Sequence, residues 1–328
     1  MITRRHLLRC VAGIVAARPL AALAQPNSPR WRIGYFGGGP TPADAAPPAA
    51  LRQALSDLGY VDGRNVTFIS RWADLKSDRL QLIASEFAEL RPDVLIVIGY
   101  PAAEAARRAT TSIPIVVSSA GDPDTMGLVA SLAHPGGNVT GISDQSALLS
   151  AKRMELLKQV QPGANRIAVL WNANNQAMTS RYQQIEYAAG ALKVSVLPLA
   201  VREPGDFDRV FASLKADRPD ALLVVTDALT NVNQARVLEF ASRNEMPAMY
   251  EAGSVVRQGG LMSYGPKQAD TFRSIAGYVD RILKGARPAD LPVEQPTEFE
   301  FVINMNAAKK LGLSIPQSMI LRADEVIQ

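Results

Sequence analysis

The chain has 328 residues, of which 47% are hydrophobic and 20% charged, and this composition is typical of a globular protein and excludes a disordered one. It carries 35 lysines and arginines against 31 acidic residues, but four of the arginines lie within the first 24 residues, so the remainder carries 31 of each sign. A balanced surface excludes sequence-independent binding of nucleic acid, which needs an excess of basic side chains.

The first 24 residues have the layout of a cleavable secretory signal peptide. Three arginines within the first nine residues precede an apolar run from Cys10 to Ala17, and Ala22-Leu23-Ala24 is a small-x-small cleavage site. The run is shorter than the roughly 20 residues of a membrane-spanning helix. We therefore expect cleavage after Ala24 and a periplasmic protein without stable membrane insertion. The pair Arg4-Arg5 also resembles a twin-arginine signal, so the Sec and twin-arginine routes both remain open.

The remaining chain has few groups that could bind a metal or carry out catalysis. It contains no cysteine, and its single histidine, His134, precedes Pro135-Gly136-Gly137 in a predicted turn. These facts exclude disulfides and metal sites built from Cys or His. No G-x-G-x-x-G, phosphate-loop or G-x-S-x-G pattern occurs. We predict no cofactor, no metal and no catalytic residue.

The sequence contains an internal duplication. About 300 residues after the signal peptide exceed what one hydrophobic core usually organises, so two domains are expected. The chain also resembles itself at an offset of about 130 residues. The matching segments are 32–36 with 166–171, 91–97 with 218–224, and 113–117 with 246–250. Three matches in the same order indicate two copies of one structural unit.

Each copy alternates short apolar strands with amphipathic helices. The first copy predicts strands at 32–36, 65–71, 93–98 and 113–118, and helices at 43–58, 77–90 and 101–110. The second predicts strands at 166–171, 193–199, 221–225 and 246–250, and helices at 176–191, 206–217 and 231–243. Continuous apolar strands between helices are typical of a parallel sheet covered on both faces. The predicted fold class is α/β, with two doubly wound parallel-sheet lobes.

The elements expected in the tail of the chain indicate that the chain passes between the two lobes three times, forming a hinge. It contains a helix at 267–284, a strand at 298–303 and a short helix at 305–311. If the long helix packs on the first lobe and the strand on the second, the chain crosses near 140–144, 261–265 and 294–299. The predicted division is a signal peptide at 1–24, a first lobe of 30–142 with 264–296, and a second lobe of 143–263 with 297–328.

Ligands of open parallel sheets bind beyond the carboxyl ends of the strands, where helices begin. The first lobe offers five candidate ligand-binding residues there: Phe36, Gly37, Gly38, Tyr100 and Ser119. The second lobe offers eight: Trp171, Asn172, Asn174, Asn175, Thr226, Asp227, Tyr250 and Glu251. Each could instead serve only as a cap or a packing residue. As a set, aromatic rings, amides, hydroxyls and two acids suit a small amphipathic molecule.

Several longer motifs carry a family resemblance. They are the stretch 121–143, beginning Gly-Asp-Pro-Asp-Thr-Met-Gly, and the later stretches 260–265, 282–285 and 304–316. These resemble the ABC transporter substrate-binding proteins that include tryptophan and tyrosine binders. The resemblance implies a type I periplasmic-binding-protein fold, no catalytic activity, and an ABC permease with its ATPase as partners. It also implies that a loop like 172–175 holds a ligand carboxylate at a helix N-terminus.

One departure from the family pattern leaves the ligand open. Aromatic amino-acid binders tend to carry Ser or Pro near the end of that loop, where this sequence has Gln176-Ala177. The predicted function is therefore the periplasmic solute-binding component of an ABC import system, with an amino acid or an aromatic or organic acid as ligand in the interlobe cleft. A ligand-sensing subunit of a membrane receptor or kinase, or an exported α/β enzyme, remains an alternative. A two-lobed repressor would need a helix-turn-helix where the signal peptide lies.

Overall fold

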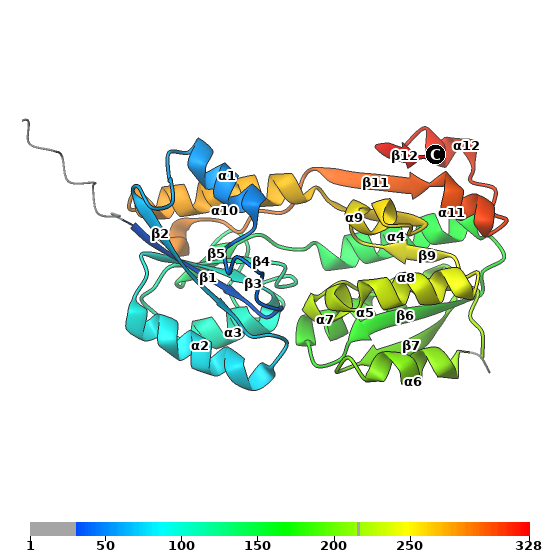
Figure 1. Ribbon diagram of the computed structural model, residues 1–328, viewed down its shortest axis with the longest axis horizontal. Coiled ribbons are helices and arrows are strands. Elements are labelled where there is room, and N and C mark those ends of the chain that lie inside the picture. The colour runs from blue at the N-terminus through cyan, green and yellow to red at the C-terminus, as the bar shows by residue number, and fades with distance from the viewer. Residues whose placement is uncertain (1–30, 215–216) are drawn as a thin grey trace, which may run out of the picture.

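The computed structural model describes residues 31–214 and 217–328, so the predicted signal peptide and its cleavage site lie outside the described residues. Figure 1 shows two lobes side by side along the long axis, each built on a sheet with helices on both faces. The predicted fold class, two parallel-sheet α/β lobes, is confirmed.

The first lobe is a five-stranded, wholly parallel sheet with the order β2-β1-β3-β4-β5. Apolar residues of α1 and α10 cover one face, and those of α2 and α3 cover the other. Helix α10 comes from the tail of the chain and lies along α1 (Figure 1). The elements are β1 (Trp31–Gly37), α1 (Ala49–Asp57), β2 (Val66–Trp72), α2 (Ser77–Leu90), β3 (Val94–Ile98), α3 (Tyr100–Ala109), β4 (Ile115–Ser118), β5 (Val139–Gly141), α10 (Gln268–Leu283) and the short 3-10 helix η1 (Pro288–Asp290).

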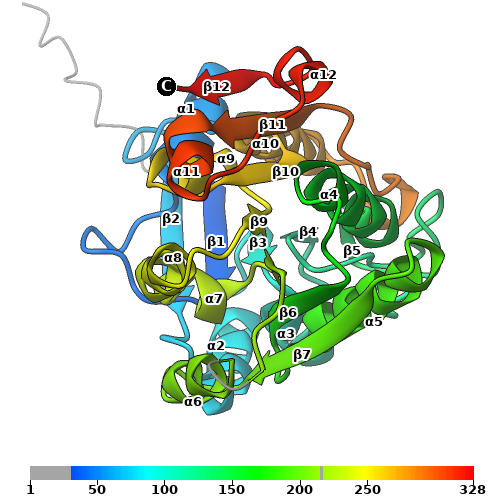
Figure 2. The same cartoon turned by 90° about the vertical axis from the view of Figure 1, so that its right-hand side faces the viewer.

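The second lobe has the sheet order β12-β11-β10-β9-β8-β6-β7, in which only β10 and β11 pair antiparallel. Figure 2 shows α4 and α5 on one face of this sheet and α6 to α9 on the other. The elements are α4 (Ser146–Val160), β6 (Arg166–Asn172), α5 (Gln176–Ala191), β7 (Ser195–Val201), α6 (Asp206–Ser213), β8 (Ala221–Val224), α7 (Ala228–Val232), α8 (Gln234–Arg243), β9 (Ala248–Tyr250), α9 (Gly253–Arg257), β10 (Met262–Pro266), β11 (Phe299–Asn304), α11 (Met305–Lys310), α12 (Gln317–Ile320) and β12 (Glu325–Ile327).

The duplication read from the sequence is also present in the topology. The order β2-β1-β3-β4-β5 of the first sheet recurs as β7-β6-β8-β9-β10 in the second. In the first lobe the N–H of Arg32 donates to Asp93 Oδ2 at 2.7 Å. In the second the N–H of Arg166 donates to Asp220 Oδ2 at 2.9 Å. The repeated Arg and Asp thus close the same corner between the first and third strands of each copy.

The chain passes between the lobes three times. The first and third connections run side by side, since the N–H of Ser143 donates to the carbonyl of Glu294 at 2.9 Å. The second lies at Lys267, whose N–H donates to the carbonyl of Glu298 at 3.1 Å. We expected this second crossing at 261–265 and a lobe boundary at 263/264, and both positions are wrong. Residues 262–266 form β10 inside the second sheet, and their Gly and Pro are poor strand formers.

Two helix predictions also differ from the structure. We expected a helix from 43, but α1 begins at Ala49, because Pro47 and Pro48 disfavour helix in the residues before them. No helix was predicted over 146–160, where α4 lies. Helix α4 packs on both α5 and β10 and buries Arg153, so its apolar residues do not form one clear face opposite a polar one.

Candidate functional site

The carboxyl ends of the strands of both lobes meet where the lobes face each other. The hydroxyl of Tyr100, in the first turn of α3, donates to Gln176 Oε1 at the start of α5, at 3.2 Å. A Cβ atom placed on Gly39 would lie 3.8 Å from Ala228 Cβ in α7. Leu75, after β2, packs against the apolar core of the second lobe. The loops predicted to bind a ligand therefore line the contact between the lobes.

The first-lobe candidates divide between core and interface. Phe36 is fully buried and packs on Phe87 of α2, with ring centroids 6.0 Å apart, so the structure places it in the core. Gly37 lies against the ring of Trp72, which leaves no room for a side chain there. The carbonyl of Gly38 accepts the N–H of Leu75 at 3.0 Å. This bond ties the glycine loop to the residues that follow β2.

Tyr100 and Ser119 differ in exposure. Tyr100 follows Gly99, whose φ of +90° favours glycine, and its side chain is buried. Burial raises the pKa of its hydroxyl, which is neutral at pH 7 and donates to Gln176. Ser119 is exposed and adopts a positive φ of 53°. Tyr100 thus makes a hydrogen bond to the second lobe. The described hydrogen bonds give no such contact for Ser119.

Three polar candidates of the second lobe form one hydrogen-bonded group. The amide of Asn172 donates to Asp227 Oδ2 at 2.6 Å, and the amide of Asn175 donates to the same atom at 3.4 Å. Asn175 also caps α5, because its Oδ1 accepts the N–H of Ala177 at 3.1 Å. Asp227 in turn caps α7 through a capping box with Thr230. Residues 55 positions apart in the sequence thus meet in one cluster.

Asn174 lies outside this cluster. Its side chain is exposed, and its amide donates to the carbonyl of Arg202 at 3.2 Å, beyond the end of β7. The N–H of Asn174 donates to Asn172 Oδ1 at 3.0 Å, which closes the turn between β6 and α5. Asn174 therefore shapes the loop and does not join Asp227.

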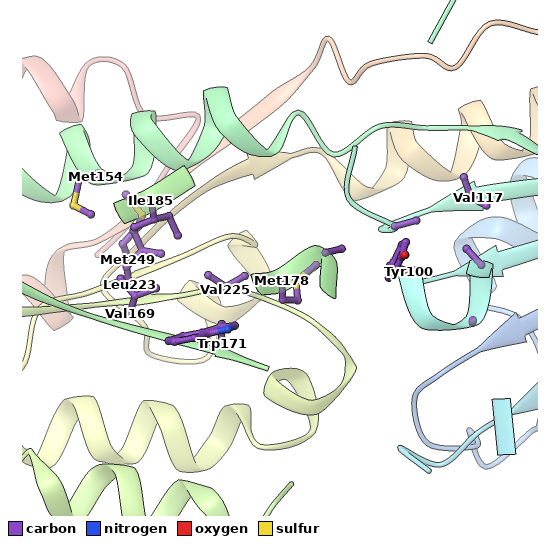
Figure 3. Close-up of a cluster of buried hydrophobic side chains, with 14 of the residues drawn as sticks. Tyr100, Val117, Met154, Val169, Trp171, Met178, Ile185, Leu223, Val225 and Met249 are labelled. Carbon is purple, nitrogen blue, oxygen red and sulfur yellow. The ribbon is translucent and has the colours of Figure 1, made fainter. Parts of the chain in front are cut away.

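The structure places two aromatic candidates in cores. Trp171 stacks on Tyr182 of α5 with ring centroids 3.9 Å apart. Figure 3 shows Trp171 among apolar side chains of the second lobe, whereas Tyr100 lies across from Met178. Tyr250 is buried on the opposite face of the sheet, against Gly260, and burial raises the pKa of its hydroxyl. The structure does not bring either ring to the group around Asp227.

Glu251 belongs to a buried network of charges. Its side chain is only 10% exposed, and its carboxylate accepts Arg153 and Arg181 at 2.8 Å each. It also accepts the N–H of Thr226 at 3.2 Å, which fixes the backbone immediately before Asp227. Arg181 reaches further to Asp144 Oδ2 at 2.7 Å. Glu251 therefore pairs with two buried arginines, a role that the sequence analysis did not predict.

The sequence analysis missed the other three members of this network. Arg153 lies on α4, Arg181 on α5 and Asp144 in the first connection between the lobes. Asp144 Oδ2 also accepts the N–H of Gly121 at 2.8 Å, from the loop after β4. An arginine on a helix is usually solvent-exposed, so a single sequence contains no signal that marks these two as buried.

Burial raises the pKa values of Asp144 and Glu251, whereas pairing with arginine lowers them. Burial raises the pKa of the Asp144 carboxyl to about 6, because Arg181 and the Gly121 N–H offset only part of the cost of burying its charge. Burial also acts to raise the pKa of Glu251, but Arg153, Arg181 and the Thr226 N–H together hold it below its usual range. Glu251 is therefore charged at neutral pH, and Asp144 is the member of the network that titrates near pH 6.

The described part of the chain contains neither a cluster of metal ligands nor a membrane-spanning helix. Within residues 31–214 and 217–328, no three His, Cys, Asp or Glu side chains gather as metal ligands would. In the same ranges, no helix combines the length and the apolar character needed to cross a bilayer.

Sequence comparison finds relatives over nearly the whole described chain. The profile of the family described as ABC transporter substrate binding protein matches residues 42–327. A protein of Clostridioides difficile strain R20291 named tyrosine-binding protein is 30% identical over 276 residues, which cover 83% of this chain and 79% of that one.

Two solved structures are similar to this chain at comparable identity. One is a domain from a Streptococcus pneumoniae ABC protein in complex with L-Trp, 25% identical, covering 91% of this chain and 100% of that one, with a TM-score of 0.83. The other is the ligand-free, open structure of a Clostridium difficile substrate binding protein, 28% identical, covering 91% and 99%, with a TM-score of 0.64. The whole chain thus superposes more closely on the L-Trp complex than on the open protein.

Proposed function

The chain belongs to the ABC transporter substrate binding protein family, and on this premise we propose that it is the exported, non-enzymatic solute-binding component of an ABC importer. In this proposal it binds one amino acid between its lobes and delivers it to a membrane permease driven by an ATPase. The ligand carries an α-carboxylate and an α-ammonium group, and an aromatic side chain is the best-supported third part.

The observation that carries this proposal is the position of Asp227 beside the capped start of α5. The first turn of α5 contains no acidic residue, so the partial positive charge of the helix N-terminus is free to attract a carboxylate. Asp227 supplies a negative charge suited to an ammonium group. Asn175 links the two sites, because one side chain caps the helix and contacts Asp227. A paired positive and negative site matches the two charges of an amino acid.

The relatives support an aromatic ligand. One is named for tyrosine, and another was solved with L-Trp. In this chain Tyr100 places a buried aromatic ring at the interface between the lobes, where a flat ligand side chain could pack against it.

The first prediction tests the ammonium site. Asp227→Asn keeps an oxygen that can cap α7 but removes the charge, so it should weaken binding of L-tyrosine and L-tryptophan by about 1.5–3 kcal/mol, which is roughly 10- to 150-fold. It should change binding of 3-(4-hydroxyphenyl)propanoate and indole-3-propanoate far less, because these acids lack the ammonium group. Isothermal titration calorimetry of residues 25–328 measures both affinities.

Asp208→Asn is the matched control, because this aspartate lies in the same lobe with its side chain 85% exposed. It should leave every affinity unchanged. Equal losses for the amino acids and for the acids lacking the ammonium would contradict the role of Asp227. Failure of the unaltered protein to bind any of the amino acids tested at millimolar concentration would overturn the proposed ligand class.

A further inference from the structure

The first half of α5 makes a line of contacts with the first lobe. Gln176 Oε1 accepts the hydroxyl of Tyr100 at 3.2 Å. Ala177 lies against Gly121, and Arg181 pairs with Asp144, which itself accepts the Gly121 N–H. Ala177 and Arg181 are four positions apart and thus share one side of the helix. These contacts tie α5, which Asn175 caps, to the opposite lobe.

The fit at Gly121 shows how close the lobes come. A Cβ atom added there would lie 3.0 Å from Ala177 Cβ, and the φ of +78° also favours glycine. Ala177 and Tyr100 are both buried, whereas Gln176 is exposed. The bond between Tyr100 and Gln176 therefore lies at the rim of a closely packed contact. A rotation that separates the lobes would break this bond.

We propose that Tyr100 and Gln176 form a latch that joins the lobes once ligand is bound and thereby sets how long the ligand stays. This inference rests on the proposed function, because the latch closes the ligand-bound arrangement. Gln176 directly follows the loop 172–175, and its side-chain amide reaches Tyr100 across the interface. A hydrogen bond made only in the closed arrangement slows opening, so it acts on the rate of ligand release.

Release rates test the latch directly. Tyr100→Phe removes only the hydroxyl, and Gln176→Ala removes only an exposed amide, so both variants should fold. Each should raise the rate of L-tryptophan release about two- to tenfold with little change in the association rate, as measured by stopped-flow fluorescence. The double variant should release ligand no faster than the faster single variant, because both substitutions remove the same bond. Tyr182→Phe is the control, since its hydroxyl bonds Glu186 within α5 at 3.1 Å.

A second measurement uses a cross-link between the two positions of the latch. Cys10 is the single cysteine of the full chain, so residues 25–328 carrying Tyr100→Cys and Gln176→Cys have only the two introduced thiols. A short bismaleimide should join them within one molecule. Unchanged release rates, or additive effects in the double variant, would overturn the latch while leaving amino-acid binding intact. If no amino acid binds, the proposed function fails; if L-tryptophan binds but does not increase the cross-link, the latch alone is overturned.

Discussion

Replacing Glu251 with Ala is expected to lower the free energy of unfolding by about 3–5 kcal/mol, because it leaves buried arginines without their counter-charge. Arg153 would retain the carbonyl of Tyr264, which accepts its Nε–H at 2.7 Å. Arg181 would retain Asp144. The side chain of Arg153 is only 4% exposed, so little water can reach its guanidinium to replace the lost carboxylate. A loss of this size is a large part of the 5–15 kcal/mol typical of a folded domain.

Urea denaturation of the two proteins measures this loss. Glu239→Ala is the control, because Glu239 pairs with Arg243 on the surface, where the two side chains are 55% and 77% exposed. Exposed pairs of this kind contribute about 0–1 kcal/mol. If Glu251→Ala cost no more than Glu239→Ala, the network would not hold the fold together as its geometry indicates.

Asp144→Asn is expected to remove a pH dependence of stability between about pH 4 and pH 7. The pKa of Asp144 is raised to about 6 in the folded chain, above its ordinary value. A raised pKa means that the folded state binds the proton more tightly than the unfolded state. Its contribution to stability is therefore complete below the unfolded pKa, near 3.9, and is lost as the pH rises through about 6. The difference between the two values corresponds to about 3 kcal/mol at most.

The expected readout is the slope of the free energy of unfolding plotted against pH. Several charged or polar groups face Asp144: Arg181 from α5, Glu251 from the end of β9, Arg153 from α4, and Asp122 with its partner Ser143 at the first connection. Asn has nearly the same shape as Asp but does not titrate, so the variant should lose the slope. Its altered contact with Arg181 changes the free energy of unfolding by the same amount at every pH and does not affect the slope. Urea midpoints at several pH values from 4.5 to 7.5 measure it, and Asp208→Asn should behave like the unaltered chain. Parallel curves for Asp144→Asn and the unaltered chain would contradict the assignment.

Glu251 does not contribute in this range, which keeps the test specific. Its pKa lies below the usual value, so the stability it provides is present above its unfolded pKa and is lost only as the pH falls through the lower folded value. That loss begins near the unfolded pKa of glutamate, about 4.3, which lies below the measured range of pH 4.5 to 7.5. A decline in the free energy of unfolding that ends near pH 6 and is absent in Asp144→Asn therefore reports Asp144.

Parts of the site could be read from the sequence because the topology rule for parallel sheets is local. Each strand and the turn after it are neighbours in the chain, so their carboxyl ends mark one edge of a lobe wherever the lobe lies in space. Asn172, Asn175 and Asp227 follow β6 and β8, which are adjacent strands, and the structure brings them within hydrogen-bond distance. From the first lobe, Tyr100 reaches the start of α5, and Gly38 bonds Leu75, which packs against the second lobe.

The direction of a side chain at a strand end could not be read in this way. Both faces of these sheets are covered by helices, so a residue such as Phe36, Trp171 or Tyr250 finds apolar surroundings on either face and leaves no alternating pattern to interpret. The structure sends all three into cores. Their apolar character, which made them candidate walls for a ligand, is the same property that packs them inside a lobe.

The sequence by itself determined the duplicated α/β fold, because hydrophobic periodicity and repeated segments are properties of neighbouring residues. Only the tertiary structure decided the network of Arg153, Arg181, Asp144 and Glu251. These residues come from two helices, a strand end and a connection between the lobes, and up to 107 positions separate them. Such a charge can be buried only if folding places an opposite charge from a distant part of the sequence next to it, and this depends on how the lobes pack together.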